Sequence, residues 1–397
     1  MTKTSNTIWN KQFTCAFFAN FMLCFSQHSV NTLISTYADF LGAGAVIVGM
    51  VSGLYFAVAV AARPFSGPII TRQDKRLIMI LTYILGVITG LMYAVSTNIT
   101  LFIVSRILHG IEFAFVGSLN LTVASDSLPK EKLGTGIGTF GLGSAIATAI
   151  GPSMGIAVRD WFMAAHGEAA GYVAVFVLSA AFMLLGLIPA FLMSPSKPSK
   201  EVLASLGPWY KSIAAKEAIV PALLMCLVCM AQNIITIYML PFAEWRGISN
   251  VGMYFTVYAI FLLVSRPLCG KLVDMVGVNK VYIPSAVLYM AAFVLIGTSH
   301  SLVQLLVAAA LAAVGFGTIN SAIMTFCMRS VPVERRGVAS NTQYFGMDLG
   351  YFAGPFIGGI VYAAFGYAKM YVLGTVPLLL SCIVFAIGWH FMKNKLY

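Results

Sequence analysis

Two ten-residue stretches, TAIGPSMGIA at 148–157 and YFAGPFIGGI at 351–360, carry Gly-Pro and a second Gly at the same positions. They lie 203 residues apart, and the same offset recurs at other glycine, proline, arginine and glutamate positions. These further pairs are Arg63, Pro64 and Gly67 with Arg266, Pro267 and Gly270; Pro129, Glu131 and Gly134 with Pro332, Glu334 and Gly337; and Gly143 with Gly346. One constant offset indicates an internal duplication whose two copies run in the same direction.

The composition excludes a soluble globular protein and a disordered one. Of the 397 residues, 59% are hydrophobic and 9% are charged, whereas an ordinary soluble domain carries about 25% charged residues. The apolar residues form blocks of about 20 or more, which is long enough to cross a bilayer core as a helix. A membrane β-barrel would show shorter segments of alternating polarity instead. The sequence therefore predicts an all-α integral membrane protein.

The hydrophobic blocks predict twelve transmembrane helices in two parallel six-helix halves. We expect an N-terminal six-helix bundle in 1–193, a Ser-, Pro- and Lys-rich cytoplasmic linker in 194–217 and a C-terminal six-helix bundle in 218–397. Parallel repeats of this kind are typical of one large transporter class, in which substrate binds between the halves. The predicted helices are about 12–38, 45–66, 77–96, 99–125, 134–157, 172–193, 219–243, 250–271, 279–299, 302–328, 337–365 and 368–391.

Charge sets the expected orientation. The net charge is +11, from 24 Lys and Arg against 13 Asp and Glu. Nearly all basic residues fall on one side if both termini are cytoplasmic, as expected for a multi-pass protein of the cell (inner or plasma) membrane. Arg159 would lie outside, in a predicted loop at 158–171. This pattern explains the positive charge without nucleic acid as a partner.

The seven cysteines are scattered and odd in number, so no disulfide framework is expected. Cys226 and Cys229 form a C-x-x-C inside an apolar helix without a second ligand pair, and no metal site is expected there.

The loop after the eighth predicted helix reads GKLVDMVGVNK at 270–280. This stretch, with Gly270, Asp274, Gly277 and Lys280, resembles the cytoplasmic G-x-x-x-D-x-x-G-x-x-K/R motif of the major facilitator superfamily. The resemblance spans nearly the whole chain. It implies twelve helices as two parallel bundles, a small-molecule substrate, alternating access and, as a family expectation, a monomer.

The matching loop of the first half departs from that motif. It keeps Gly67, Arg72 and Arg76, but Thr71 stands where the family prefers Asp, and Asp74 where it prefers Gly. The first-half gate therefore cannot use a carboxylate at position 71. Asp74 has the wrong spacing for the same contact.

A second motif that resembles the family is the helix-bend signature G-x-x-x-G-P-x-x-G-G. The eleventh predicted helix carries it in full, at Gly350, Gly354, Pro355, Gly358 and Gly359. In the family the signature is associated with antiporters when it lies in the fifth helix. Here the fifth helix keeps Gly151, Pro152 and Gly155 but has Ala147 and Ile156 at the outer positions, so the antiport inference is weakened.

Four polar or charged residues inside the helices each belong to one copy of the repeat only. Arg106 aligns with Ala309, Glu112 with Gly315, His28 with Ala231 and Asp348 with Ala145. A charge facing lipid costs about 2.5–3.5 kcal/mol, so these groups should face a central cavity or pair. The predicted substrate and proton cavity comprises His28, Asn31, Arg106, His109, Glu112, Gln232, Asn233, Asn320, Gln343 and Asp348.

The fourth predicted helix is the strongest candidate for proton coupling. Arg106 begins Arg-x-x-x-Gly110, which resembles a further family element, and Arg106 and His109 share one helical stripe with Glu112 at its edge. Arg106 could serve coupling or an anionic group, or could pair structurally with Glu112. Glu112 is the expected proton carrier. Asp348 is a second candidate, although it and Gln343 are five residues apart and cannot both face the cavity squarely.

These features favour a proton-coupled secondary transporter that exports a small amphiphilic drug or metabolite. Uptake of an anionic or hydroxylated nutrient by proton symport is the alternative, and a receptor that has lost transport is a third hypothesis. No H-E-x-x-H, G-x-S-x-G or G-x-x-x-x-G-K motif occurs, so the chain is not expected to be an enzyme. The proton gradient would replace any cofactor, and the partners would be the substrate and the lipid bilayer.

Overall fold

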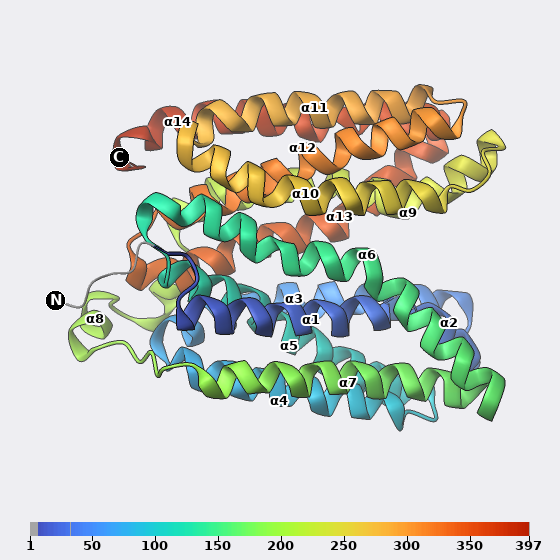
Figure 1. Cartoon of the computed structure of the whole chain (residues 1–397), viewed down its shortest axis with the longest axis horizontal. Coiled ribbons are helices and arrows are strands. Elements are labelled where there is room, and N and C mark those ends of the chain that lie inside the picture. Colours follow the sequence, from blue (N-terminus) through green and yellow to red (C-terminus); the bar gives the residue numbers. More distant parts are fainter. Residues whose placement is uncertain (1–6, 32, 397) are drawn as a thin grey trace. The chain divides into compact units, whose positions relative to one another are not determined.

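The computed structural model describes residues 7–31 and 33–396, and throughout these residues the regular structure is helical, without a strand. Twelve helices in the described chain have 20 residues or more (Figure 1). They are α1 (Lys11–Asn31), α3 (Ala45–Arg72), α4 (Lys75–Ala94), α5 (Ile99–Asp126), α6 (Leu133–His166), α7 (Glu168–Leu192), α9 (Ile219–Arg246), α10 (Gly252–Val276), α11 (Val278–Thr298), α12 (Leu302–Arg329), α13 (Arg336–Leu373) and α14 (Thr375–Leu396). The short helices are α2 (Ile34–Phe40) and α8 (Lys200–Ser205), with 3-10 turns η1 (Lys130–Lys132), η2 (Trp209–Ser212), η3 (Lys216–Ala218) and η4 (Val333–Arg335).

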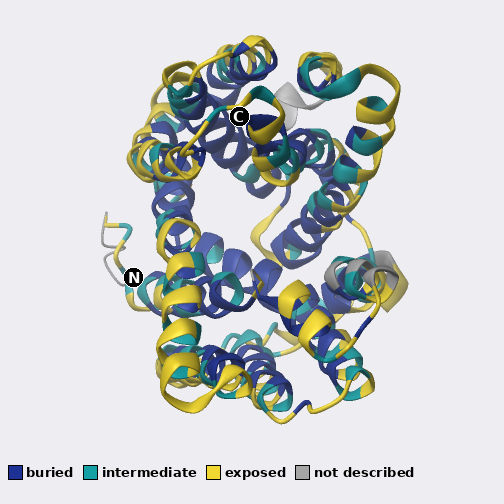
Figure 2. Cartoon of the chain, turned by 90° about the vertical axis from the view of Figure 1, so that its right-hand side faces the viewer, coloured by how far each residue is buried: buried dark blue, intermediate teal, exposed yellow. Residues whose placement is uncertain are grey.

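The twelve long helices follow the predicted order, and most are apolar enough to cross a bilayer. Within the described residues, nine long helical stretches meet that requirement by length and composition. The other three long helices, α1, α10 and α14, are shorter or less apolar over any such stretch. Large side chains such as Leu184, Leu185 and Ile188 of α7 are exposed. Figure 2 shows exposed residues on the outer faces of the helices and buried residues toward the interior of each unit.

The chain divides into two compact units that differ from the predicted halves. The first contains residues 1–127 and 143–213, and the second contains 128–142 and 214–397. The start of α6 therefore packs with the second unit, because glycines allow a close backbone approach there. A Cβ added at Gly138 would lie 2.5 Å from the Arg266 carbonyl oxygen, and one at Gly270 would lie 2.4 Å from that of Gly134.

Each unit is built from helices that pack side by side along their length. In the first unit, α1 and α4 pack against both α5 and α7, and α3 packs against α5. Aromatic residues from α2, α4, α5 and α7, including Tyr37, Tyr93, Phe102 and Phe176, meet in one buried cluster. In the second unit, α9 packs against α13 and α14, and α12 packs against α10 and α11.

Two predicted boundaries were wrong. The predicted helix 12–38 is divided, since α1 ends at Asn31 and α2 begins at Ile34. The predicted loop 158–171 is almost entirely helical: α6 continues through His166 and α7 begins at Glu168. The single residue between them, Gly167, has φ +90°, a conformation that favours glycine.

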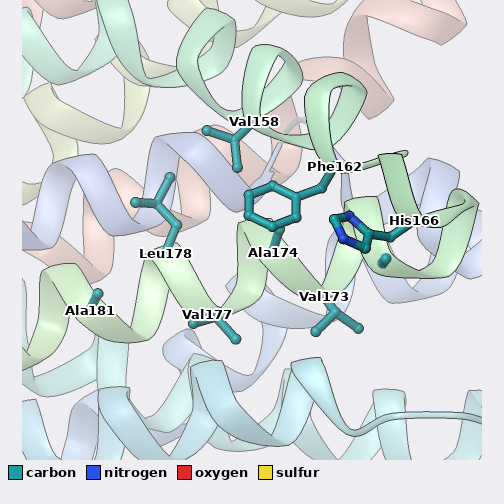
Figure 3. A pocket seen from close by; sticks show the side chains of 9 residues that line it. Val158, Phe162, His166, Val173, Ala174, Val177, Leu178 and Ala181 are labelled. Atoms are coloured by element: carbon teal, nitrogen blue, oxygen red, sulfur yellow. The ribbon is translucent and has the colours of Figure 1, made fainter. Parts of the chain in front are cut away.

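Helices α6 and α7 line an open cavity of about 670 Å³. Figure 3 shows Phe162 of α6 lying between the two helices, with Ala174 of α7 facing it. The walls are apolar apart from His166, and none of the predicted substrate or proton residues lines this cavity.

Candidate functional site

Asp274 organises the second-unit loop 270–280, which was predicted as part of a cytoplasmic gate. Its carboxylate accepts hydrogen bonds from the backbone N–H of Gly134 (2.8 Å) and Thr135 (2.6 Å) and from the Thr135 hydroxyl (2.7 Å). Arg329, at the end of α12, donates a fourth at 2.9 Å. The N–H groups of a first helical turn lack intrahelical partners and carry partial positive charge. Asp274 therefore joins the ends of α10 and α12 to the start of α6.

The two glycines of this loop differ in what they make possible structurally. Gly277 has φ +88° and connects α10 to α11 with one residue. Gly270 permits the close approach to α6 described above. Lys280 is exposed in the first turn of α11.

The first-unit copy of the loop binds the linker instead. Thr71 is buried and its hydroxyl donates to the carbonyl of Gly67 (2.8 Å), while Arg72 donates to the Gly207 carbonyl (2.6 Å) and to the Ser212 hydroxyl (3.1 Å). Asp74 caps α4 through the N–H of Arg76 (3.0 Å). The same carboxylate oxygen accepts from the Ser196 N–H (2.9 Å), and Arg76 donates to the Phe191 carbonyl (2.7 Å).

The far end of the linker is bound by the second unit. The N–H of Ala215 donates to the Thr342 hydroxyl at 3.0 Å. Glu217 accepts from Arg335, also at 3.0 Å. Only Ile213 and Ala214 lie between Ser212, which Arg72 holds, and Ala215.

A buried polar cluster surrounds Arg106 in the first unit. Its guanidinium donates to the Val51 carbonyl (3.2 Å) and to the Asn31 side-chain oxygen (3.2 Å), and it lies over the Tyr55 ring at 4.6 Å. Helices α1, α3 and α5 each contribute to this environment. Arg106 is 3% exposed, so these partners replace the water that the charge has lost.

His109 connects Arg106 to Glu112. Its Nδ1 lies 3.4 Å from the Arg106 guanidinium and 3.1 Å from the Tyr93 hydroxyl, and its Nε2 lies 3.6 Å from a Glu112 carboxylate oxygen. An arginine only donates hydrogen bonds, so Nδ1 acts as the acceptor and Nε2 carries the hydrogen. Nε2 is the ring nitrogen that lies near Glu112. The other Glu112 oxygen is buried and has no hydrogen-bond partner among the described residues.

The remaining first-unit candidates lie in other contacts. His28 shares a 3.1 Å hydrogen bond with Thr148 and so joins α1 to α6. Asn120, on the same helix as Arg106, donates to the Tyr83 hydroxyl at 3.0 Å.

The second-unit candidates are mostly buried and uncharged. Gln232 accepts from the Tyr289 hydroxyl (2.6 Å), and Asn233 donates to the Tyr351 carbonyl (2.5 Å). Asn320, Gln343 and Asp348 are buried. Within the described residues, neither polar atom of the Gln343 amide has a hydrogen-bond partner.

The helix-bend signature packs α13 closely against α9. An added Cβ would lie 2.2 Å from the Cys226 carbonyl oxygen at Gly350 and 2.4 Å from that of Met230 at Gly354. Gly358 and Gly359 approach the ring of Tyr238, whose hydroxyl donates to the Pro355 carbonyl at 2.8 Å. In the first unit, Gly151 and Gly155 face His28 and Ser29 of α1 in the same way. Both helices continue through Pro152 and Pro355.

Several residues of these sites were not predicted from the sequence. Tyr55 and Tyr93 form the walls around Arg106 and His109, Tyr289 holds Gln232, and Arg329 completes the Asp274 contacts. Tyr55 had one available signal, since it aligns with Tyr258 at the repeat offset.

A duplicated helical fold with charges buried inside its membrane helices defines a multi-pass transporter. The sequence model described as Major Facilitator Superfamily matches residues 16–251 and 222–394. The chain therefore belongs to this superfamily, whose members bind small-molecule substrates within the membrane.

Full-length relatives and solved structures agree with this assignment. Multidrug resistance protein MdtG of Enterobacter lignolyticus is 24% identical, over 94% of this chain and 91% of that protein. MdtG of Citrobacter koseri is 23% identical, over 98% and 96%. The proton:xylose symporter XylE has a similar fold, with a TM-score of 0.77, 13% identity and coverage of 96% and 95%. The human organic anion transporter MFSD10 gives a TM-score of 0.73 at 16% identity, covering 94% and 98%.

Proposed function

We propose that this transporter is a proton-coupled exporter of small amphiphilic compounds that works by alternating access in the bacterial inner membrane, with both termini cytoplasmic. The proposal is supported by full-length similarity to multidrug resistance proteins. The observation that carries proton coupling is the contact of His109 with Glu112 at 3.6 Å, inside a buried cluster that also holds Arg106.

The cluster changes charge by one unit when Glu112 gains or loses a proton. With Glu112 ionised, its charge balances that of Arg106 and the pair is neutral. With Glu112 protonated, Arg106 leaves a net charge of +1. Because the group is buried, this difference acts through a poorly screened environment. A substrate that prefers one of the two states would then be coupled to the proton by thermodynamic linkage.

Tyr93 and Arg106 give His109 a positioning role in this scheme. Both contact Nδ1, so the ring presents Nε2–H toward Glu112. A proton that arrives at the buried carboxylate would therefore meet a pre-oriented neighbour. Asp348, buried in the second unit, is the second candidate for a coupled group.

The first experiment compares metabolites in cells and medium with and without overexpression. Export predicts a compound that is lost from cells and gained in the medium. Net movement inward would support symport uptake instead. No change in either pool would argue against transport of compounds present in the culture.

The second experiment uses that compound in proteoliposomes with an imposed pH gradient. We expect Glu112→Gln to abolish gradient-driven accumulation while passive exchange across the membrane continues. Asp160→Asn serves as the matched control, because Asp160 is exposed and pairs with Arg159. If Glu112→Gln and Asp348→Asn both leave gradient-driven transport unchanged, the coupling assignment is wrong.

A further inference from the structure

We propose that the open cavity between α6 and α7 of the first unit, called the α6–α7 groove, binds one acyl chain of a phospholipid, with the lipid phosphate beside His166 (Figure 3). The groove has a volume of about 670 Å³, which lies within the usual range for small-molecule sites. None of the residues proposed for substrate or proton binding lines it. The inference therefore goes beyond the proposed export function.

Side chains spaced by four residues form the two sides of the groove. Phe162 and His166 lie four residues apart on α6, and both line the groove. On α7 a partly buried row forms its floor, with Ala170, Ala174 and Leu178. Side chains four residues apart lie one above the other on a helix, so the groove runs along the helix axes. The two small alanines leave room that a larger side chain would fill.

The open edge of the groove is continuous with the lipid-facing surface of α7. Val173, Val177 and Ala181 line the groove and are exposed. The same face continues toward the linker through Leu184 and Ile188, which are also exposed. In a chain that spans the bilayer, such an apolar face contacts acyl chains. Lipid is therefore present along the whole open edge of the groove.

The length and width of the groove suit a single thin chain. From Ala170 to Ala181 the groove extends about 16 Å along α7, at 1.5 Å per residue. One leaflet, half of a hydrocarbon core of about 30 Å, has nearly the same depth. The two helices touch near one end, where a Cβ added at Gly171 would lie 2.6 Å from the Arg159 carbonyl oxygen. Another helix, about 10 Å across, is too wide to enter between them.

The polar end of the groove matches the position of a lipid headgroup. His166 is the polar residue of the lining, and a ring N–H can donate to a phosphate oxygen. Trp161 of the same helix is 70% exposed, and tryptophan is enriched where the membrane meets water. Because α7 ends at Leu192, just before the linker, the groove lies in the half of α7 away from the linker. With the linker in the cytoplasm, this half belongs to the outer leaflet.

The test titrates the full chain in detergent micelles with phosphatidylethanolamine that carries a photoreactive diazirine in its acyl chain. After illumination, peptide mass spectrometry measures the labelling of each segment of α6 and α7. We expect labelling of the groove residues to saturate, because a bound chain fills one site. Labelling at Leu184 and Ile188 should rise linearly with lipid, because detergent replaces exchanging lipid on the open surface.

Two substitutions test the two ends of the bound lipid. Ala174→Phe fills the groove opposite Phe162 and should raise the half-saturating lipid concentration about tenfold or more. Ala157→Phe is the matched control, since Ala157 is exposed on α6 and does not line the groove, and it should change nothing. His166→Ala should raise the half-saturating concentration about threefold, as for one lost hydrogen bond at an exposed position. This variant tests the site even if Ala174→Phe does not fold.

Four outcomes overturn the proposal. Labelling of the groove that rises linearly, as at Leu184, makes it ordinary lipid-facing surface. Half-saturation that neither Ala174→Phe nor His166→Ala changes places the bound lipid elsewhere. Displacement of the lipid by the exported compound assigns the groove to the substrate, and a dimer that is lost in Ala174→Phe assigns it to a second copy of the chain. Because no gradient is present, each result is independent of whether Glu112 couples protons.

Discussion

The two copies of the gate loop occupy matching places in the repeat but hold different parts of the chain. In the second unit, Asp274 collects the first turn of α6 and Arg329. In the first unit, Thr71 occupies the aligned position, and Arg72 and Asp74 hold the linker. The turn itself also differs, since Gly277 with φ +88° aligns with Asp74, which caps the next helix.

The comparison shows that the two copies of a duplicated loop can bind different partners. The first copy has Thr71 in place of a carboxylate, and its charged residues Arg72 and Asp74 contact the linker, a segment that follows the first copy of the repeat. The resemblance of the loop to a gate motif therefore describes the second copy well. The first copy is better described as an anchor for the linker.

The largest effect is expected from Asp274→Asn. The amide keeps one acceptor oxygen but places an NH₂ group against N–H donors and loses the charge that pairs with Arg329. Asp274 and Arg329 are only partly buried, so we expect a loss of about 2 kcal/mol in stability, as for lost hydrogen bonds to a charged group, measured as a lower thermal unfolding midpoint in detergent. Asp160→Asn, at an exposed pair, is the control with little change. Equal effects of the two substitutions would contradict the role given to Asp274.

Arg72→Gln should break the linker anchor without touching the second loop. Both contacts of the Arg72 guanidinium with the linker are lost. We expect trypsin to cut after Lys200 about tenfold faster, which corresponds to about 1.4 kcal/mol of local stability. Lys75→Gln is the control, since Lys75 pairs with Asp126 at 2.6 Å in the same loop. A cleavage rate that rises equally in both variants would show general loosening.

Asp74→Ala should have a smaller effect on the same readout. It removes the cap of α4, worth about 1 kcal/mol, and the contact with Ser196. Cleavage of the linker should rise about threefold. Asn98→Ala removes the cap of α5, where Asn98 accepts from the Leu101 N–H at 2.9 Å. That control should lower stability similarly and leave linker cleavage unchanged.

The smallest effect is expected from Arg335→Gln at the far end of the linker. The Arg335–Glu217 pair is about one third exposed on both sides, so solvent screening limits it to about 0.5 kcal/mol or less. A double-mutant cycle with Glu217→Gln should give a coupling of that size that fades with added salt. A coupling several times larger would make this pair, rather than Arg72, the main anchor.

The number and order of the helices could be predicted because each hydrophobic block is long enough for one membrane helix. The duplication could be predicted because matching residues recur at one constant offset. The helical connection at 158–171 did not, since charged residues such as Arg159 and Asp160 suit a loop as well as a helix that continues beyond the bilayer. The division of α1 from α2 could not be predicted, because no clear break in the hydrophobic block separates the two helices.

The sequence predicted the types of residue in the candidate sites better than it predicted which residues contact one another. Arg106 and Glu112 were expected to face a cavity or pair because burying a charge is costly. In the structure His109 lies between them, and its ring contacts Tyr93 of α4. No local sequence pattern predicts that Tyr93 lies beside His109. The partners of Arg72 and Arg76 include backbone carbonyls of Gly207 and Phe191. Backbone acceptors carry no sequence signal, so the anchoring of the linker could only come from the structure.

The two anchors of the linker leave very little free chain between them. From Ser212 to Ala215 the chain covers three peptide links, which span at most about 11 Å when fully extended. Of the 24-residue stretch that the sequence suggests as a linker, Ile213 and Ala214 alone lie between the anchored residues Ser212 and Ala215. The length of a linker in the sequence therefore overstates its free length when a side chain such as Arg72 binds it along the way.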